Sequence, residues 1–154
     1  MNVARNMTRL LKGLRRSDRG GAMVELAVIL PVLVLLVVGV VDYGRAFYTS
    51  VTVANAARAG AEWGAQSPEF QLDFAGMENF GKQDGQDAAP LNLTATRYCE
   101  CAGASWPSCT ACAGGAAPDV FIEVTASKNL TLLLPYPGLP NTVSIARKAT
   151  FRSQ

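Results

Sequence analysis

Residues 26–41 read LAVILPVLVLLVVGVV, an uninterrupted apolar block in a chain of 154 residues. About 20 predominantly apolar residues are needed to cross the hydrocarbon core of a bilayer. Residues 21–41 supply a stretch of 21 residues, and its single charged residue, Glu25, lies near one end. The block therefore predicts a transmembrane helix over residues 21–41. Pro31 lies inside it, and membrane helices tolerate proline.

The net charge changes sign on the two sides of residue 20. Residues 1–20 hold six basic residues and one acidic residue, a net charge of +5, whereas residues 21–154 hold eight basic and eleven acidic residues, a net charge of −3. Lys and Arg beside a transmembrane helix stay on the cytoplasmic side. We therefore predict a basic cytoplasmic leader at residues 1–20 and an extracytoplasmic remainder. A basic run can also bind nucleic acid, but membrane orientation explains it more simply, so no nucleic-acid partner is expected.

The helix is expected to continue beyond the membrane. After Asp42, apolar residues recur at helical spacing. These residues are Tyr43, Phe47, Val51, Ala54, Ala57, Ala61 and Ala65. The spacing predicts an extracytoplasmic continuation of the helix over residues 42–66, and Ser67-Pro68 ends it. At 1.5 Å per residue the whole helix would be roughly 70 Å long, which is more than a span alone requires.

Residues 67–154 are expected to form a small extracytoplasmic domain made mainly of antiparallel strands. Residues 67–90 are polar and contain several glycines, so they are predicted to be irregular. Alternating apolar residues rich in Val, Ile and Thr then predict half-buried strands. They lie around residues 91–101, 120–126 and 143–151. The expected fold class is α+β, with the long N-terminal helix packed against this small sheet.

The composition argues against catalysis. The chain has no histidine, which is the commonest general base and a frequent metal ligand. It also lacks a P-loop, a dinucleotide-binding fingerprint and a nucleophile elbow. Asp84 and Asp87 do not have the spacing of an EF-hand, and a solvated loop is the expected setting for them. We therefore expect no enzyme activity, no catalytic residues and no cofactor or metal.

Four cysteines follow the pattern C-x-C-x7-C-x2-C at Cys99, Cys101, Cys109 and Cys112. An even, clustered set in an exported segment favours disulfides. Zinc is the alternative, but only the second pair has a typical zinc-ligand spacing. Cys99 and Cys101 share one face of the predicted strand, so each is expected to bond across to Cys109 or Cys112. Three pairings are formally possible, and the nested one, Cys99–Cys112 with Cys101–Cys109, is preferred.

Residues 19–25, RGGAMVE, resemble a type IV prepilin signal, with a basic leader, a glycine, and a glutamate five residues after a cut at Gly20. The wider stretch 21–61 resembles the TadE-like proteins of the Flp (tight-adherence) pilus system. The residues that carry the resemblance are AMVELA (22–27), LP (30–31), Gly39, DYGRA (42–46) and NAARAGA (55–61). The proline-rich LLPYPGLP at 133–140 and the final strand are also similar to that family.

The resemblance implies processing at Gly20 and Gly21 and assembly through Glu25. Cleavage after Gly20 would leave a new amine on Gly21, and the Glu25 carboxylate would pair with that amine on a neighbouring subunit. Physical chemistry gives Glu25 a reason to seek a partner, since a charge at the centre of a membrane helix costs about 2.5–3.5 kcal/mol and less near its edge. Two alternatives remain open: Glu25 sits in the interface near the positive helix N-terminus, and the glycines form a hinge.

The resemblance also implies a function. By this resemblance the chain is expected to be a minor pseudopilin of a Tad-type secretion and adhesion system. It would cross the bacterial inner membrane once and be able to enter a pilus. Its partners would be other pilin and pseudopilin subunits, a prepilin peptidase and the inner-membrane assembly platform. The alternative is a permanently anchored extracytoplasmic binding module with an uncleaved signal-anchor. A membrane-tethered enzyme is the third and weakest interpretation.

Overall fold

The computed structural model describes residues 18–106, 109–136 and 138–153. Their helices and strands follow in the order α2 (Asp18–Ala65), η1 (Phe70–Leu72), α3 (Phe74–Asp84), η2 (Gln86–Ala88), β1 (Asn92–Cys101), β2 (Ala104–Trp106), β3 (Asp119–Thr131) and β4 (Thr142–Arg152). The chain divides into two compact units at the Val41–Asp42 boundary. Of the leader predicted at residues 1–20, residues 1–17 lie outside the described residues.

The first unit consists, as far as it is described, of the N-terminal part of α2. Every large apolar side chain from Met23 to Val37 is exposed there. α2 is long and apolar enough to cross a membrane, and Pro31 lies inside it without ending it. Exposed apolar surface of this extent is unfavourable in water, so this part of α2 needs lipid or another protein around it.

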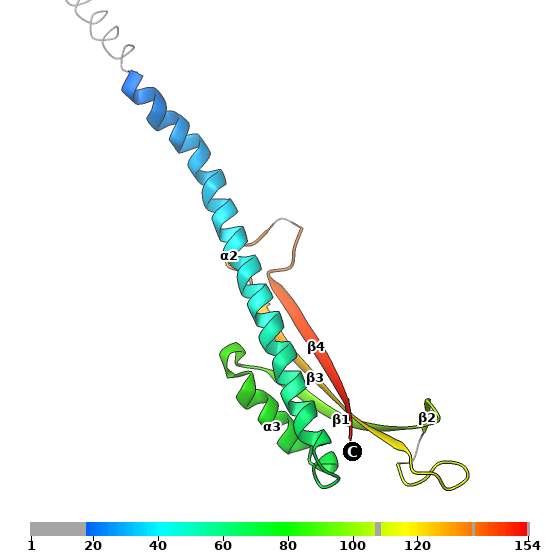
Figure 1. Ribbon diagram of the computed structural model, residues 1–154. Coiled ribbons are helices and arrows are strands. Elements are labelled where there is room, and N and C mark those ends of the chain that lie inside the picture. The colour runs from blue at the N-terminus through cyan, green and yellow to red at the C-terminus, as the bar shows by residue number, and fades with distance from the viewer. Residues whose placement is uncertain (1–17, 107–108, 137, 154) are drawn as a thin grey trace, which may run out of the picture. The chain divides into compact units, whose positions relative to one another are not determined.

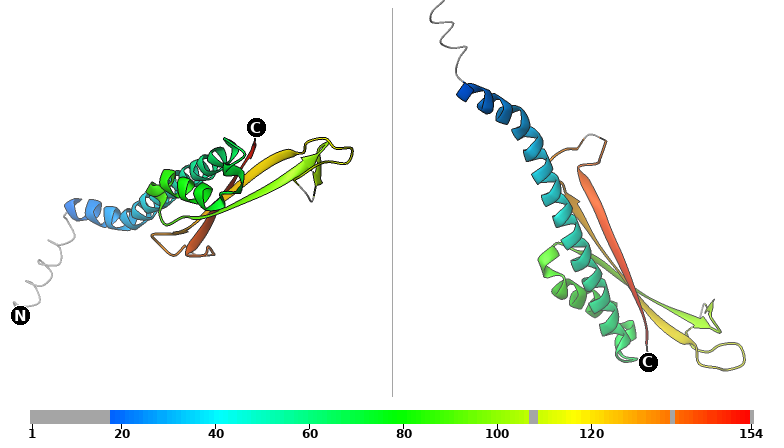
Figure 2. Two further views of the ribbon diagram at one scale, coloured as in Figure 1. Left: turned by 90° about the horizontal axis from the view of Figure 1, so that it is seen from below. Right: turned by 45° about the horizontal axis from the view of Figure 1, so that its top comes forward.

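The second unit is an antiparallel sheet with helices on one face. The strand order is β2-β1-β3-β4, and Ala95, Val124 and Ala149 lie side by side across its three long strands. Ile122, Val124 and Ala126 alternate as buried residues along β3, as the period-two pattern predicts. The C-terminal half of α2 and α3 cover the same face of this sheet (Figures 1 and 2). The α+β prediction is confirmed, and the short β2 adds a strand to the three expected.

Small residues let α2 approach the sheet closely. Ala56, Ala57 and Ala61 are fully buried on α2 together with Val53. They form one core cluster with residues of β1, β3 and α3. A side chain on Gly60 would place its Cβ 2.7 Å from the backbone oxygen of Met77. Because interiors are packed as densely as organic crystals, this face of α2 has no room for larger residues.

The prediction that residues 67–90 are irregular is wrong, because they contain α3 and two short 3-10 helices. Asp73 caps α3, and its side chain accepts a hydrogen bond of 2.8 Å from the backbone amide of Gly76. Gly76 and Gly81 lower the local helix propensity. The tertiary contact compensates, since a Cβ on Gly81 would lie 2.6 Å from the carbonyl oxygen of Ala56. Met77, fully buried, completes the contact with the core.

The close contact at Gly60 leads to a stability prediction. Gly60→Ala should lower the free energy of unfolding by about 1–2 kcal/mol, because overpacking costs about 1–3 kcal/mol and the gain in helix propensity offsets up to about 1 kcal/mol. The full chain in detergent micelles, unfolded in urea and followed by Trp63 fluorescence, provides the measurement. Gly44→Ala is the matched control, because nothing lies within 4 Å of its added Cβ. Equal unfolding midpoints for the two variants would contradict the packing argument.

Candidate functional site

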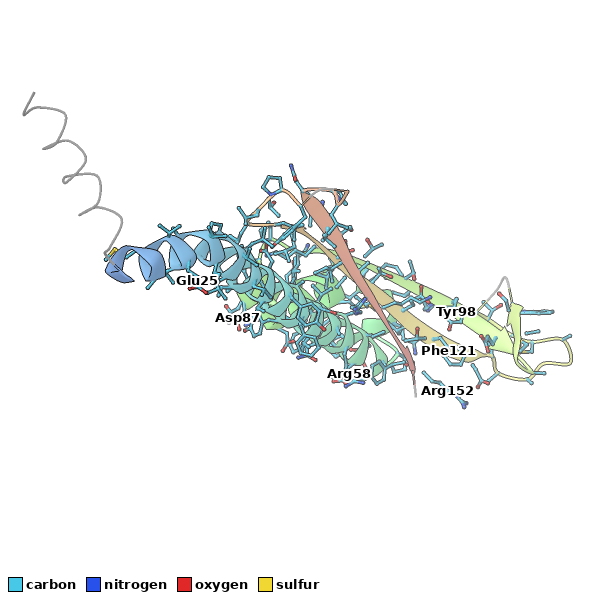
Figure 3. All side chains as sticks on the ribbon, turned by 90° about the horizontal axis from the view of Figure 1, so that it is seen from above. Glu25, Arg58, Asp87, Tyr98, Phe121 and Arg152 are labelled. Atoms are coloured by element: carbon cyan, nitrogen blue, oxygen red, sulfur yellow. A yellow bond between two sulfur atoms is a disulfide. The ribbon has the colours of Figure 1, made fainter. Side chains whose placement is uncertain are left out.

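Glu25 lies on an exposed position of α2 with its side chain directed away from the helix axis (Figure 3). It takes part in none of the ion pairs between described residues. Its neighbours along the helix are apolar and exposed as well, for example Val24 and Leu26. A charge in apolar surroundings is costly, so a cation from another molecule would stabilise this carboxylate. The assembly role of Glu25 stays a prediction, and its geometry is compatible with that role.

Gly20 and Gly21 both lie within α2 and are exposed. A Cβ added to either residue would meet nothing within 4 Å. No packing requirement in the described chain therefore calls for glycine at these two positions. A peptidase that binds an extended backbone must unwind the helix here, and each glycine makes that easier by about 0.5–1 kcal/mol relative to alanine. Processing after Gly20 stays a prediction.

Three residues of α2 that follow the apolar block form an exposed apolar stripe: Tyr43, Phe47 and Val51. Their exposed fractions are 74%, 65% and 45%. The sequence pattern grouped them with Ala57 and Ala61, but only those two alanines are buried. The buried residues of this part of α2 are Asp42 and Thr49, and at 3.6 residues per turn the stripe lies about a third to half a turn away from their side of the helix. The stripe therefore leaves the buried face and lies open beside it.

Asp42 connects α2 to the β3–β4 loop. Asp42 is only 4% exposed. Its carboxylate accepts a hydrogen bond from the backbone amide of Leu133, with distances of 3.1 Å to Oδ1 and 3.0 Å to Oδ2. The Tyr136 hydroxyl donates to Oδ2 at 3.2 Å, and Arg45 pairs with Oδ1 at 3.3 Å. We call Asp42, the Leu133 amide and Tyr136 the Asp42 latch. Only Arg45 lies near Asp42 in the sequence, at i,i+3, whereas the other two partners lie more than 90 positions away.

The surroundings of Tyr136 keep its hydroxyl protonated. Desolvation by burial, followed by the hydrogen bond to Asp42 and the charge of Asp42, raises the pKa of Tyr136 above its usual value. A neutral phenol can donate to a carboxylate, whereas a phenolate would repel it. Because a tyrosine hydroxyl is protonated at physiological pH in any case, the raised pKa extends this donor to more alkaline solution.

The disulfides are confirmed, but the preferred nested pairing is wrong. Cys99 bonds to Cys109 with a Cα–Cα distance of 5.4 Å, and Cys101 bonds to Cys112 at 5.7 Å. The reason is the tight turn at residues 102–103, which places Trp106 opposite Cys99. The chain leaving β2 therefore reaches Cys99 first. A nested pairing requires a hairpin centred several residues later.

A hollow beside the last strand has a volume of about 640 Å³ and includes Gln71, Asp119, Arg152 and Ser153 in its lining. Its polar groups already bind one another. Gln71 donates to the Ser153 hydroxyl at 2.8 Å, and Arg152 pairs with Asp119 at 2.5 Å. This arrangement stabilises the junction between η1 and the C-terminal strand. Within the described residues there is also no group of three His, Cys, Asp or Glu side chains that could hold a metal ion.

The two tryptophans have packing roles. Trp63 packs against Phe70 with ring centroids 4.3 Å apart and ring planes tilted by 32°. Trp106 donates from its indole nitrogen to the carbonyl oxygen of Ala111 at 3.0 Å. In the same part of the sheet, Tyr98 and Phe121 are opposed across β1 and β3, with ring centroids 5.3 Å apart (Figure 3). These contacts order the end of the sheet that carries the disulfides.

Residues 20–62 match the family model described as TadE-like protein. The matched segment begins at Gly20 and contains Glu25, Asp42 and the exposed apolar stripe. Comparisons with curated proteins and with solved structures gave no match.

The observed pairing leads to a prediction for double cysteine variants. Cys99→Ser/Cys109→Ser should remove one whole disulfide and leave no alkylatable thiol. Cys99→Ser/Cys112→Ser should break both bonds and leave two thiols that label under native, non-reducing conditions. Mass spectrometry after alkylation distinguishes them. Each lost bond should also lower stability by about 2–3 kcal/mol, the range for short loops of this size. The reverse labelling pattern would support the nested pairing.

Proposed function

We propose that this chain, a TadE-like protein over residues 20–62, is a pseudopilin-like membrane protein of a Tad pilus system that assembles with other pilin-like subunits through α2. The family match supports a membrane protein associated with such a pilus. In this proposal the leader stays in the cytoplasm, the apolar part of α2 crosses the inner membrane, and the disulfide-bonded domain lies outside. The chain acts by helix packing and performs no catalysis.

The exposed apolar stripe is the observation that carries the proposal. A membrane span needs only about 20 residues, and the apolar block provides them before Asp42. Tyr43, Phe47 and Val51 come after the block, on a part of α2 whose other side is buried at Asp42 and Thr49. A second helix packed along this stripe would bury these side chains. Complete burial of a large apolar side chain stabilises the complex by about 1.5–3 kcal/mol. Such a surface suits lateral assembly better than anchoring alone.

Glu25 supplies the electrostatic part of the same assembly. After cleavage at Gly20, the amine of a neighbouring Gly21 would provide the cation that Glu25 lacks among the described residues. Packing of helices would replace lipid contacts, and the ion pair would neutralise a charge that is costly in an apolar environment. The peptidase and the assembly platform are the further partners in this scheme.

The stripe is tested by Phe47→Ser. This variant should insert into the membrane and keep the folded domain, because Phe47 contributes nothing to the core. Its pilus-associated fraction should fall about tenfold or more, since a loss of 1.4 kcal/mol corresponds to a factor of ten. Leu72→Ser is the control, because Leu72 is equally exposed but lies on η1. Immunoblots of membrane and sheared-pilus fractions give the ratio. Equal ratios for both variants would remove the proposed packing role.

The ion pair is tested by Glu25→Gln, which keeps the shape and removes the charge. Synthesis, insertion and cleavage should be unchanged, so the mature protein should still begin at Gly21 by N-terminal sequencing. Incorporation should fail, because breaking a buried pair by removing one partner costs about 3–5 kcal/mol. Glu62→Gln, an exposed position on the same helix, controls for loss of a negative charge. A parent protein that begins at Met1, or full incorporation of Glu25→Gln, would favour the permanently anchored module instead.

A further inference from the structure

The loop between β3 and β4 combines features that a soluble hairpin does not need. Residues 129–146 contain no charged residue. Leu133 and Leu139 are 55% and 60% exposed, and Leu134 is exposed as well. Leucine side chains left in water at a hairpin tip are unfavourable, because their apolar surface gains free energy when it is buried. Apolar patches of this kind mark a contact with lipid or protein.

The position of the loop favours lipid as its contact partner. Leu133 is hydrogen-bonded to the side chain of Asp42, and Asp42 is the residue directly after the apolar block. The loop is therefore tied to the point in the chain where the membrane span is expected to end. We propose that the β3–β4 loop is a second membrane contact of this chain, in which Leu133, Leu134 and Leu139 enter the boundary between lipid headgroups and acyl chains while the Asp42 latch holds the loop against α2. This inference rests on α2 spanning a membrane and not on pilus assembly.

The backbone of the loop is prepared for such a contact. An amide that enters an apolar environment without a partner costs several kcal/mol. The Leu132 amide donates to the Asn141 carbonyl at 2.9 Å, and the Leu139 amide donates to the Tyr136 carbonyl at 3.1 Å. The Leu133 amide is held by Asp42. Pro135 and Pro140 have no amide hydrogen to satisfy. The backbone at these five positions therefore adds little cost when the leucines leave water.

The polar groups of the latch fit the membrane boundary. Tyrosine is enriched at this depth because its ring is apolar and its hydroxyl is polar, and the Tyr136 hydroxyl is already bonded to Asp42. Arg45, which pairs with Asp42, has a side chain that is 42% exposed and able to reach lipid phosphates. Shallow insertion of side chains, without burial of the loop in the hydrocarbon core, satisfies all these groups. The loop and α2 would then contact the bilayer at two points and limit rotation of the domain about α2.

Depth-dependent fluorescence quenching tests this contact. The full chain is placed at one copy per nanodisc of phosphatidylcholine, with or without bromine on the acyl chains. A tryptophan introduced by Leu139→Trp should lose about half or more of its added emission in brominated lipid, as expected for an apolar side chain some 5–10 Å into the interface. Leu72→Trp, equally exposed on η1, should lose none. Leu33→Trp in the apolar block shows that the protein is inserted.

The latch is tested in the same nanodiscs. Asp42→Ala added to Leu139→Trp should reduce the quenching about twofold or more, because the loop then loses its attachment beside the interface. Retained circular dichroism and the absence of free thiols show that the domain stays folded. Quenching of Leu33→Trp without quenching of Leu139→Trp would overturn the proposal. A blue shift of Leu139→Trp emission that appears only with several copies per disc would assign the loop to protein contact instead. Neither outcome depends on pilus assembly.

Discussion

The close approach of α2 to the sheet is the contact on which the other features depend. Ala56, Ala57 and Gly60 present so little side chain that the backbone of Met77 and the side chain of Val124 reach the helix. This face has no room for larger side chains, and the aromatic Tyr43 and Phe47 lie exposed outside it. The interior packing therefore determines which surface of α2 is buried and which stays exposed. The same contact stabilises α3, whose glycines would otherwise disfavour a helix.

Asp42 imposes a second constraint at the other end of this packed segment. A buried carboxylate is costly unless donors surround it, and this one is satisfied by the Leu133 amide, Tyr136 and Arg45. The loop must therefore be in place for the carboxylate to be stable, and the carboxylate must be in place for the loop to be ordered. The latch holds the loop at Asp42, the residue directly after the apolar block, and the leucines of the loop stay exposed. The loop and the stripe are thus two exposed apolar surfaces of the same domain.

The far end of the sheet relies on covalent bonds. The β2 end, with the loop that follows it, extends beyond the helices (Figures 1 and 2), so few core residues can order it. The Cys99–Cys109 and Cys101–Cys112 bonds hold this loop to β1. Short disulfide loops restrict the unfolded chain and stabilise segments that cannot be stabilised by burial. The domain is thus stabilised by side-chain packing beside α2 and by disulfides at the end of the sheet that α2 does not cover.

Patterns formed by residues close together in the sequence determined the elements that could be predicted without the structure. The apolar run ending at Val41 requires a long helix, and alternation along β1, β3 and β4 requires half-buried strands, because each pattern is set by the local geometry of the backbone. The positions of Gly20 and Glu25 relative to this run carry the resemblance to prepilin signals in the same local way. Tertiary structure decided the rest. α3 forms because distant residues fill the space its glycines leave, and the disulfide pairing follows from the register of the β1–β2 hairpin. The exposed stripe and the Asp42 latch depend on which face of α2 meets the sheet and on partners over 90 residues away, and no local pattern contains that information.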